Sequence, residues 1–90
     1  MTSSPCVEAV LLALRAELAR SELVRESRAS TASLESAIVR CEAAVEALRA
    51  DGSSSAAYQF DVLARTAIDE WELGADLTVA VVECAQNLRR

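Results

Sequence analysis

Cysteines and closely spaced carboxylates are the residues of this 90-residue sequence whose chemistry could serve catalysis. A cysteine thiolate can act as a nucleophile if a base lies within reach, and as a metal ligand if other ligands are near. Cys6, Cys41 and Cys84 are far apart in the sequence, and the chain contains no histidine. Their odd number and wide spacing match no disulfide framework. We therefore expect them to be small, buried apolar residues.

Neighbouring carboxylates could form an acid–base pair if a cleft separated their pKa values. Asp69 and Glu70 are adjacent, and Glu42 and Glu46 are one helical turn apart. A solvated helix face explains both pairs better, because such a face needs charged residues to keep an apolar chain soluble. We predict no catalytic residue, no cofactor and no metal site, and we expect that the protein is not an enzyme.

The charge balance excludes several kinds of partner. Fourteen acidic residues against nine arginines give a net charge of −5 at pH 7. Phosphate backbones and anionic lipids are bound by clustered basic side chains, so the sign disfavours both. The sequence has no run of about 18 uncharged apolar residues, and its N-terminus lacks the basic start of a secretory signal. We expect a cytoplasmic protein that binds neither nucleic acid nor membrane.

The composition indicates an all-α fold. Hydrophobic residues make up 52% of the chain but aromatic residues only 3%, and a core of alanine, valine and leucine suits helix packing. Two glycines and one proline are too few for the turns of a many-stranded sheet. We predict one domain over residues 1–90, an antiparallel helical hairpin. Its first arm is expected at about residues 5–51, its bend at 51–55 and its second arm at about 55–88.

The first arm contains two apolar segments. Ser4 and Pro5 form a suitable helix start, with a capping side chain followed by a residue that needs no amide donor. Spacings of three and four residues place the larger apolar side chains on helical faces: Val7, Val10, Leu11, Leu14 and Leu18, then Leu34, Ile38, Cys41, Val45 and Leu48. The two segments are out of phase by about one residue. The arm is therefore either continuous or bent or broken near residues 28–33, which the sequence leaves open.

The bend is predicted from the cluster of helix-breaking residues that separates the two arms. Gly52 directly follows the first arm, where a chain leaving a helix often needs a positive φ. The serines at 53–55 are candidate N-caps for the second arm.

The second arm has one long apolar face, here called the seam, which we expect to pack against the first arm. The seam consists of Phe60, Ala64, Ala67, Trp71, Gly74, Thr78, Val81, Ala85 and Leu88. We expect Trp71 to be a buried anchor and Gly74 a point of close packing. The valine-rich residues 77–82 favour a strand by propensity, but a lone strand would leave its backbone groups unpaired, so we predict a helix.

A second apolar stripe lies beside the seam and consists of Leu73, Leu77, Ala80 and Cys84, spaced four, three and four residues apart. One opposing helix cannot cover both the seam and this second stripe. We therefore predict that the second stripe, together with Val82, forms the interface with another protein.

The residues after the bend suggest a known family. Gly52 is followed by Tyr58 and Gln59, then by alanines, Glu70 and the valine-rich end Val79–Val82. Over roughly residues 40–82 this order resembles the small helical co-chaperones of the type III secretion needle subunit, in which a long helix ends in a short Gly- or Asp-containing loop and a Tyr-Gln pair opens a second helix. The first forty residues match this family only in being helical.

The resemblance implies a protein that performs no chemistry. It would bind a tetratricopeptide-like chaperone, and the two together would keep the needle subunit from polymerising in the cytosol. The residues alone also allow a self-associating coiled-coil adaptor, whose apolar stripes would pair with those of another copy.

Overall fold

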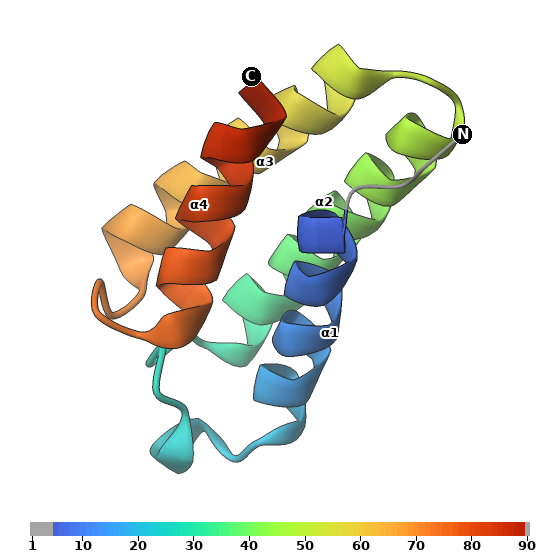
Figure 1. Cartoon of the computed structure of the whole chain (residues 1–90). Helices are drawn as coiled ribbons and strands as arrows, with labels where there is room; N and C mark the ends of the chain where they lie inside the picture. Colours follow the sequence, from blue (N-terminus) through green and yellow to red (C-terminus); the bar gives the residue numbers. More distant parts are fainter. Residues whose placement is uncertain (1–4, 90) are drawn as a thin grey trace.

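Helices account for most of the computed structural model, which describes residues 5–89 (Figure 1). The elements are α1 (Pro5–Ala19), the short 3-10 helix η1 (Glu22–Val24), α2 (Thr31–Arg49), α3 (Ser53–Glu70) and α4 (Asp76–Arg89). Successive α-helices run antiparallel, α1 packs against α2 and α4, and α3 packs against the same two helices. The all-α prediction is therefore confirmed. Within residues 5–89, no helix combines the length and apolar character needed to cross a bilayer.

Each predicted arm is divided into two helices. The first arm is interrupted over residues 20–30, which begins earlier than the predicted region of 28–33. The second arm was predicted to be one helix over about residues 55–88, and this was wrong, because α3 ends at Glu70 and α4 begins at Asp76. The four described helices therefore form a small antiparallel bundle rather than a hairpin with a single reversal (Figure 1).

Contacts from distant parts of the chain fix the end of α3. Trp71 has an extended backbone (φ −106°, ψ 167°), and its indole Nε1 donates a hydrogen bond to Ser33 Oγ at 2.9 Å. The next amide, that of Glu72, donates to the Ser27 carbonyl at 2.8 Å. Gly74 is exposed, and an added Cβ there would have no atom within 4 Å. Gly74 therefore belongs to the turn between α3 and α4 and is not the predicted point of close packing.

The reversal between α2 and α3 occurs where predicted, but with different residue roles. Asp51 has the positive φ, 64°, whereas Gly52 has φ −99° and is the N-cap of α3, so none of the serines at 53–55 caps this helix. The Gly52 amide donates to the Ala47 carbonyl at 2.6 Å and the Asp51 amide to the Leu48 carbonyl at 3.1 Å, the paired bonds of a Schellman motif. A Cβ on Gly52 would lie 3.1 Å from the Ala47 oxygen, so glycine serves a close approach here.

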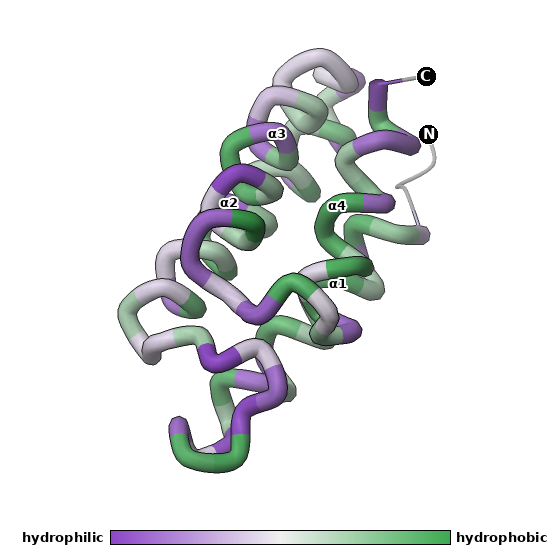
Figure 2. The backbone as a smooth tube through the Cα atoms, turned by 90° about the vertical axis from the view of Figure 1, so that its left-hand side faces the viewer, coloured by the Kyte–Doolittle hydropathy of each residue, from purple (hydrophilic) through white to green (hydrophobic). Residues whose placement is uncertain are grey.

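The core lies along the predicted apolar faces. Its buried members include Val7, Val10, Leu14, Leu34, Cys41, Val45, Phe60, Ala64, Ala67, Trp71, Thr78, Val81 and Ala85. Trp71 is only 5% exposed, which confirms it as a buried anchor. The valine-rich residues 77–82 are helical, as predicted. Figure 2 shows many of the hydrophobic positions on α1 and α4, where these two helices lie near each other.

Candidate functional site

The predicted interface residues do not share one exposed surface. Leu77 and Cys84 are 8% and 1% exposed and belong to the core. Leu73 is 62% exposed, whereas Ala80 and Val82 are half-buried. We expected that one opposing helix could not cover both the seam and the second stripe, but in the structure two helices, α1 and α3, pack on α4. Because the first arm is divided into α1 and α2, α1 can pack against α4 while α2 packs against α3. In this position α1 covers part of the second stripe.

Cys84 also has a covalent partner. Cys6 and Cys84 form a disulfide between α1 and α4, with their Cα atoms 5.6 Å apart. Of the three cysteines, only Cys41 is free and buried as predicted. Burial, with a smaller contribution from the Glu42 carboxylate, raises the pKa of the Cys41 thiol to about 12. The thiol is therefore protonated at neutral pH and is a poor nucleophile. Sequence spacing missed the disulfide because its partners are 78 residues apart.

Two predicted interface residues, Leu73 and Val82, line a surface groove between α3 and α4. The groove has a volume of about 380 Å³ and is lined by Ile68, Leu73, Thr78, Val79, Val82, Glu83 and Gln86. We call it the α3–α4 groove. Its large apolar side chains are well exposed, at 48% for Ile68, 62% for Leu73 and 42% for Val79. Exposed apolar residues that gather in one place are typical of a contact surface.

Charged residues occur on both helices that form this groove. Arg89 Nη2 lies 2.8 Å from Asp61 Oδ1, and the ion pair joins the last turn of α4 to α3. Glu83 lines the groove and forms no ion pair with another described residue. Residues 53–89, which contain α3 and α4, include six acidic residues and two arginines. The electrostatic potential over this half of the molecule therefore favours a basic partner.

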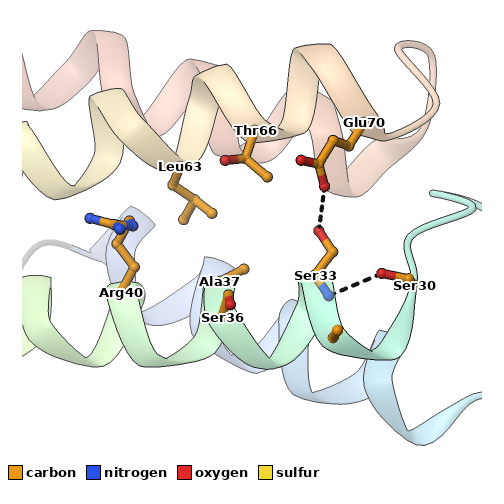
Figure 3. Close-up of a pocket in the computed structure, with 9 residues that line it drawn as sticks. Ser30, Ser33, Ser36, Ala37, Arg40, Leu63, Thr66 and Glu70 are labelled. Atoms are coloured by element: carbon orange, nitrogen blue, oxygen red, sulfur yellow. Dashed lines mark hydrogen bonds between the residues drawn. The ribbon is translucent and has the colours of Figure 1, made fainter.

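A second hollow, of about 420 Å³, lies between α2 and α3 and is polar (Figure 3). Ser33 Oγ donates to Glu70 Oε1 at 3.2 Å across the two helices, while Ser30 Oγ accepts the Ser33 amide at 3.0 Å and caps α2. Arg40, at the other end of the hollow, donates from Nη1 to Gln59 Oε1 at 2.8 Å. These polar side chains are engaged in joining α2 to α3. We therefore assign this hollow a structural role.

The loop over residues 20–30 is held by a buried arginine. The Arg25 side chain is 4% exposed. Its Nε donates to the carbonyls of Glu17 and Arg20, and its Nη2 donates to the carbonyl of Leu18, each at 3.1 Å. The last carbonyls of a helix lack partners within the helix. Arg25 supplies hydrogen-bond donors to these carbonyls from the loop that follows α1. The sequence pattern did not predict this role.

The same loop presents an apolar tip. The buried Glu17 carboxylate accepts hydrogen bonds from the Ser27 amide at 3.0 Å and the Ser27 hydroxyl at 2.7 Å, which fix the return of the loop. Leu23 and Val24, in η1, are 96% and 62% exposed. Figure 2 shows this loop projecting beyond the helices, with a hydrophobic segment at its tip. Leu23 and Val24 are the large apolar residues of an otherwise polar segment, so the sequence could have indicated them as exposed.

No family model, curated protein or solved structure matches this chain. The resemblance to the needle-subunit co-chaperones therefore remains a prediction from the residues of the bend and of the second arm. The geometry of the described residues is the basis for any functional assignment.

The α3–α4 groove differs from the other surface features of the described residues. No group of three or more cysteine, aspartate or glutamate side chains in residues 5–89 is placed to hold a metal ion. In the α2–α3 hollow, Ser30, Ser33, Arg40 and Glu70 make hydrogen bonds within the chain, and Arg25 and Ser27 do so in the loop over residues 20–30. The α3–α4 groove differs from both because it presents apolar side chains to solvent, and it is our candidate functional site.

Proposed function

We propose that this chain is a non-enzymatic protein-binding module whose α3–α4 groove receives an amphipathic helix of its partner. The observation that carries the proposal is the exposure of Ile68, Leu73 and Val79 in one groove. A helix can place residues at positions i, i+3, i+4 and i+7 into such a groove and remove its apolar surface from water.

The charge of the groove region defines the partner further. With six acidic residues and two arginines over residues 53–89, this half of the chain attracts a helix with a basic polar face. Complementary charges at the rim of an interface chiefly raise the rate of association and select against acidic competitors. The proposal does not include nucleic acid or membranes as partners, because the net charge of the chain is negative and both of these partners are anionic.

The more specific proposal is a cytoplasmic co-chaperone of the type III secretion needle subunit. In that role the chain would bind a tetratricopeptide-like chaperone and help to keep the needle subunit monomeric. Gly52 in a short loop and the Tyr58-Gln59 pair near the start of α3 support this assignment. The interruptions over residues 20–30 and 71–75 depart from the long helices that the resemblance implies.

Self-association is the alternative function. Its support is the exposure of Leu12 on α1 and Val39 on α2, at 68% and 67%, on helices that do not line the α3–α4 groove. Two apolar surfaces on one chain could contact different copies, as an adaptor of coiled-coil type requires.

Sedimentation velocity can separate these functions. The chain would be measured alone, with a tetratricopeptide-like needle chaperone, and with a basic amphipathic helical peptide. Association with the chaperone supports the co-chaperone, association with the peptide alone supports the more general binding module, and concentration-dependent growth of the isolated chain supports the adaptor. A monomer that binds neither probe would contradict the proposed function.

A matched pair of variants locates the contact. Leu73→Asp places a charge in the α3–α4 groove, whereas Leu12→Asp places the same charge on an equally exposed leucine of α1. We expect Leu73→Asp to weaken binding roughly tenfold or more, because an unpaired charge in a desolvated contact is costly. Leu12→Asp should leave binding unchanged. Equal effects of the two substitutions would show that the groove is not the site.

A further inference from the structure

The Cys6–Cys84 disulfide joins α1 and α4, two helices whose mutual contact is small. Among the four main helix pairs of the described residues, α1 and α4 make the smallest contact. A hollow of about 430 Å³ lies between them, and Ala9, Ala13 and Ala80 are among its lining residues. Short alanine side chains leave this boundary poorly filled, so it gains little from dispersion contacts.

The polar side-chain bonds of α1 to α2 and to the following loop lie in its C-terminal half. Arg15 Nη2 lies 2.6 Å from Glu42 Oε2 of α2, and the buried Glu17 is bonded to Ser27 in the following loop. Toward the N-terminal end, Val7 and Val10 are buried in the core. The disulfide at Cys6 is the covalent tie of this half to α4.

We propose that the Cys6–Cys84 disulfide is a redox latch. When a dithiol reductant opens it, the N-terminal part of α1, residues 5–14, separates from α4, while α2 and α3 remain folded. A helix can open from one neighbour at a lower free energy than the whole molecule unfolds, and the contact of α1 with α4 is the smaller of its two main helix contacts.

The two sulfur atoms differ in access, which sets the order of the reaction. Cys6 is half-buried, whereas Cys84 is 1% exposed. The thiolate of the reductant therefore attacks Cys6 Sγ and forms a mixed disulfide with it, and Cys84 leaves as a thiolate that takes up a proton. The second thiol of the reductant then displaces the Cys6 sulfur. The chain gains two electrons and two protons, and the reductant is oxidised to its own disulfide.

Cys41 does not compete in this exchange. Its Sγ lies 3.5 Å from the carbonyl oxygen of Val7, the residue after Cys6. Because the Cys41 thiol has a pKa of about 12, it contributes almost no thiolate at neutral pH, and the thiolate is the attacking species. The pairing of Cys6 with Cys84 is thus protected from reshuffling.

Opening the latch has a consequence for α4. Separation of α1 removes the cover of Leu77 and Cys84, which are buried in the closed form. The second stripe would then be a continuous apolar surface on α4. This surface shares Leu73 with the α3–α4 groove, but Leu77, Ala80 and Cys84 do not line that groove, which is open with the disulfide intact. The latch therefore stands independently of the proposed function.

Hydrogen–deuterium exchange measured by mass spectrometry tests the latch. The oxidised chain is compared with the chain reduced by dithiothreitol. We expect amides of residues 9–14 to exchange roughly tenfold faster after reduction, with those of α2 and α3 unchanged. Cys6→Ser should show the fast exchange without reductant, and Cys41→Ala should respond to reduction as the unaltered chain does. Unchanged exchange in α1 after reduction, or equal acceleration in all four helices, would overturn the proposal.

The order of attack has its own measurement. Brief treatment with glutathione, followed by acid quenching and peptide mapping, captures the mixed disulfide. We expect glutathione on the peptide that contains Cys6. Capture chiefly on Cys84 would contradict the mechanism derived from the difference in exposure.

Discussion

The indole Nε1 of Trp71 donates a hydrogen bond to Ser33 Oγ at 2.9 Å and thereby joins the end of α3 to the first turn of α2. The same hydroxyl donates to Glu70 Oε1 at 3.2 Å. One serine thus serves two residues that follow each other at the C-terminal end of α3. This relationship places the Trp71 ring in the core and turns the chain toward α4.

Removal of the Trp71 ring should strongly destabilise the bundle. Trp71 is 5% exposed, and Trp71→Ala is expected to lower the free energy of unfolding by about 3–5 kcal/mol, which could unfold so small a domain. Urea denaturation followed by circular dichroism measures the change. A loss below about 1 kcal/mol would show that the ring contributes little to the core.

The hydrogen bond itself can be tested at Ser33. Ser33→Ala leaves the indole N–H without its acceptor and should cost about 1–3 kcal/mol. Ser36→Ala, at an exposed serine of the same helix, is the control and should change stability by no more than about 0.5 kcal/mol. The comparison uses the same urea denaturation. Equal losses of stability at both positions would show that the hydrogen bond from Trp71 is not the cause of the loss at Ser33.

The Schellman motif after α2 predicts substitutions of opposite sign. Asp51 has φ 64°, so Asp51→Gly should stabilise the fold by up to about 1 kcal/mol. Gly52→Ala brings a Cβ to 3.1 Å from the Ala47 oxygen and should destabilise by about 1 kcal/mol. Thermal denaturation of both variants tests the pair. Stabilisation by Gly52→Ala would show that the loop relaxes away from the contact.

The buried arginine of the loop over residues 20–30 should not be replaceable by lysine. Arg25 donates to three carbonyls at the end of α1, and a lysine ammonium cannot reproduce this planar arrangement of donors. Arg25→Lys should therefore cost about 1–3 kcal/mol and increase amide exchange in the loop. Arg28→Lys, at an arginine whose side chain is 81% exposed, should have little effect. Tolerance of Arg25→Lys would contradict the capping role.

The Cys41 thiol predicts a loss of stability at high pH. In the folded chain its pKa is raised from 9.0 to about 12, and burial is the largest cause of this rise. The unfolded chain therefore releases this proton at lower pH than the folded chain does, so ionisation favours unfolding above about pH 9 and increasingly toward pH 12. Below about pH 9 the thiol is protonated in both the folded and the unfolded chain, so the fold keeps the full stability that the buried neutral thiol allows. Denaturation midpoints between pH 8 and pH 11 should fall less steeply in Cys41→Ala. Parallel slopes would show that the thiol does not cause the loss.

Helical content and the faces of the core follow from local periodicity. The spacing of Val7 and Leu14, and of Phe60 and Val81, placed these residues correctly in the core. Such positions depend on which residues share a helical face, and a sequence contains this information directly. The helix over residues 77–82 was also predictable, because the sequence offered no second strand to pair with the backbone groups of a strand there.

The breaks between helices could not be predicted in this way. The turn after α3 depends on the Trp71 and Glu72 bonds to residues far earlier in the chain. Of the predicted interface, Leu73 and Val82 line the candidate groove, whereas Leu77 is covered because α1 folds onto α4. Each difference arises from a tertiary contact that replaces a locally favoured arrangement.

The position of the disulfide determines how the molecule would respond to mechanical tension. Cys6 and Cys84 lie near the outer ends of α1 and α4, and nearly all of the described chain is enclosed between them. A pull applied at residues 5 and 89 of the oxidised protein would pass through the sulfur–sulfur bond, so the chain between the cysteines would not lengthen. In the reduced protein the same pull would separate α1 from α4 first. The redox state would therefore decide whether the bundle extends under load.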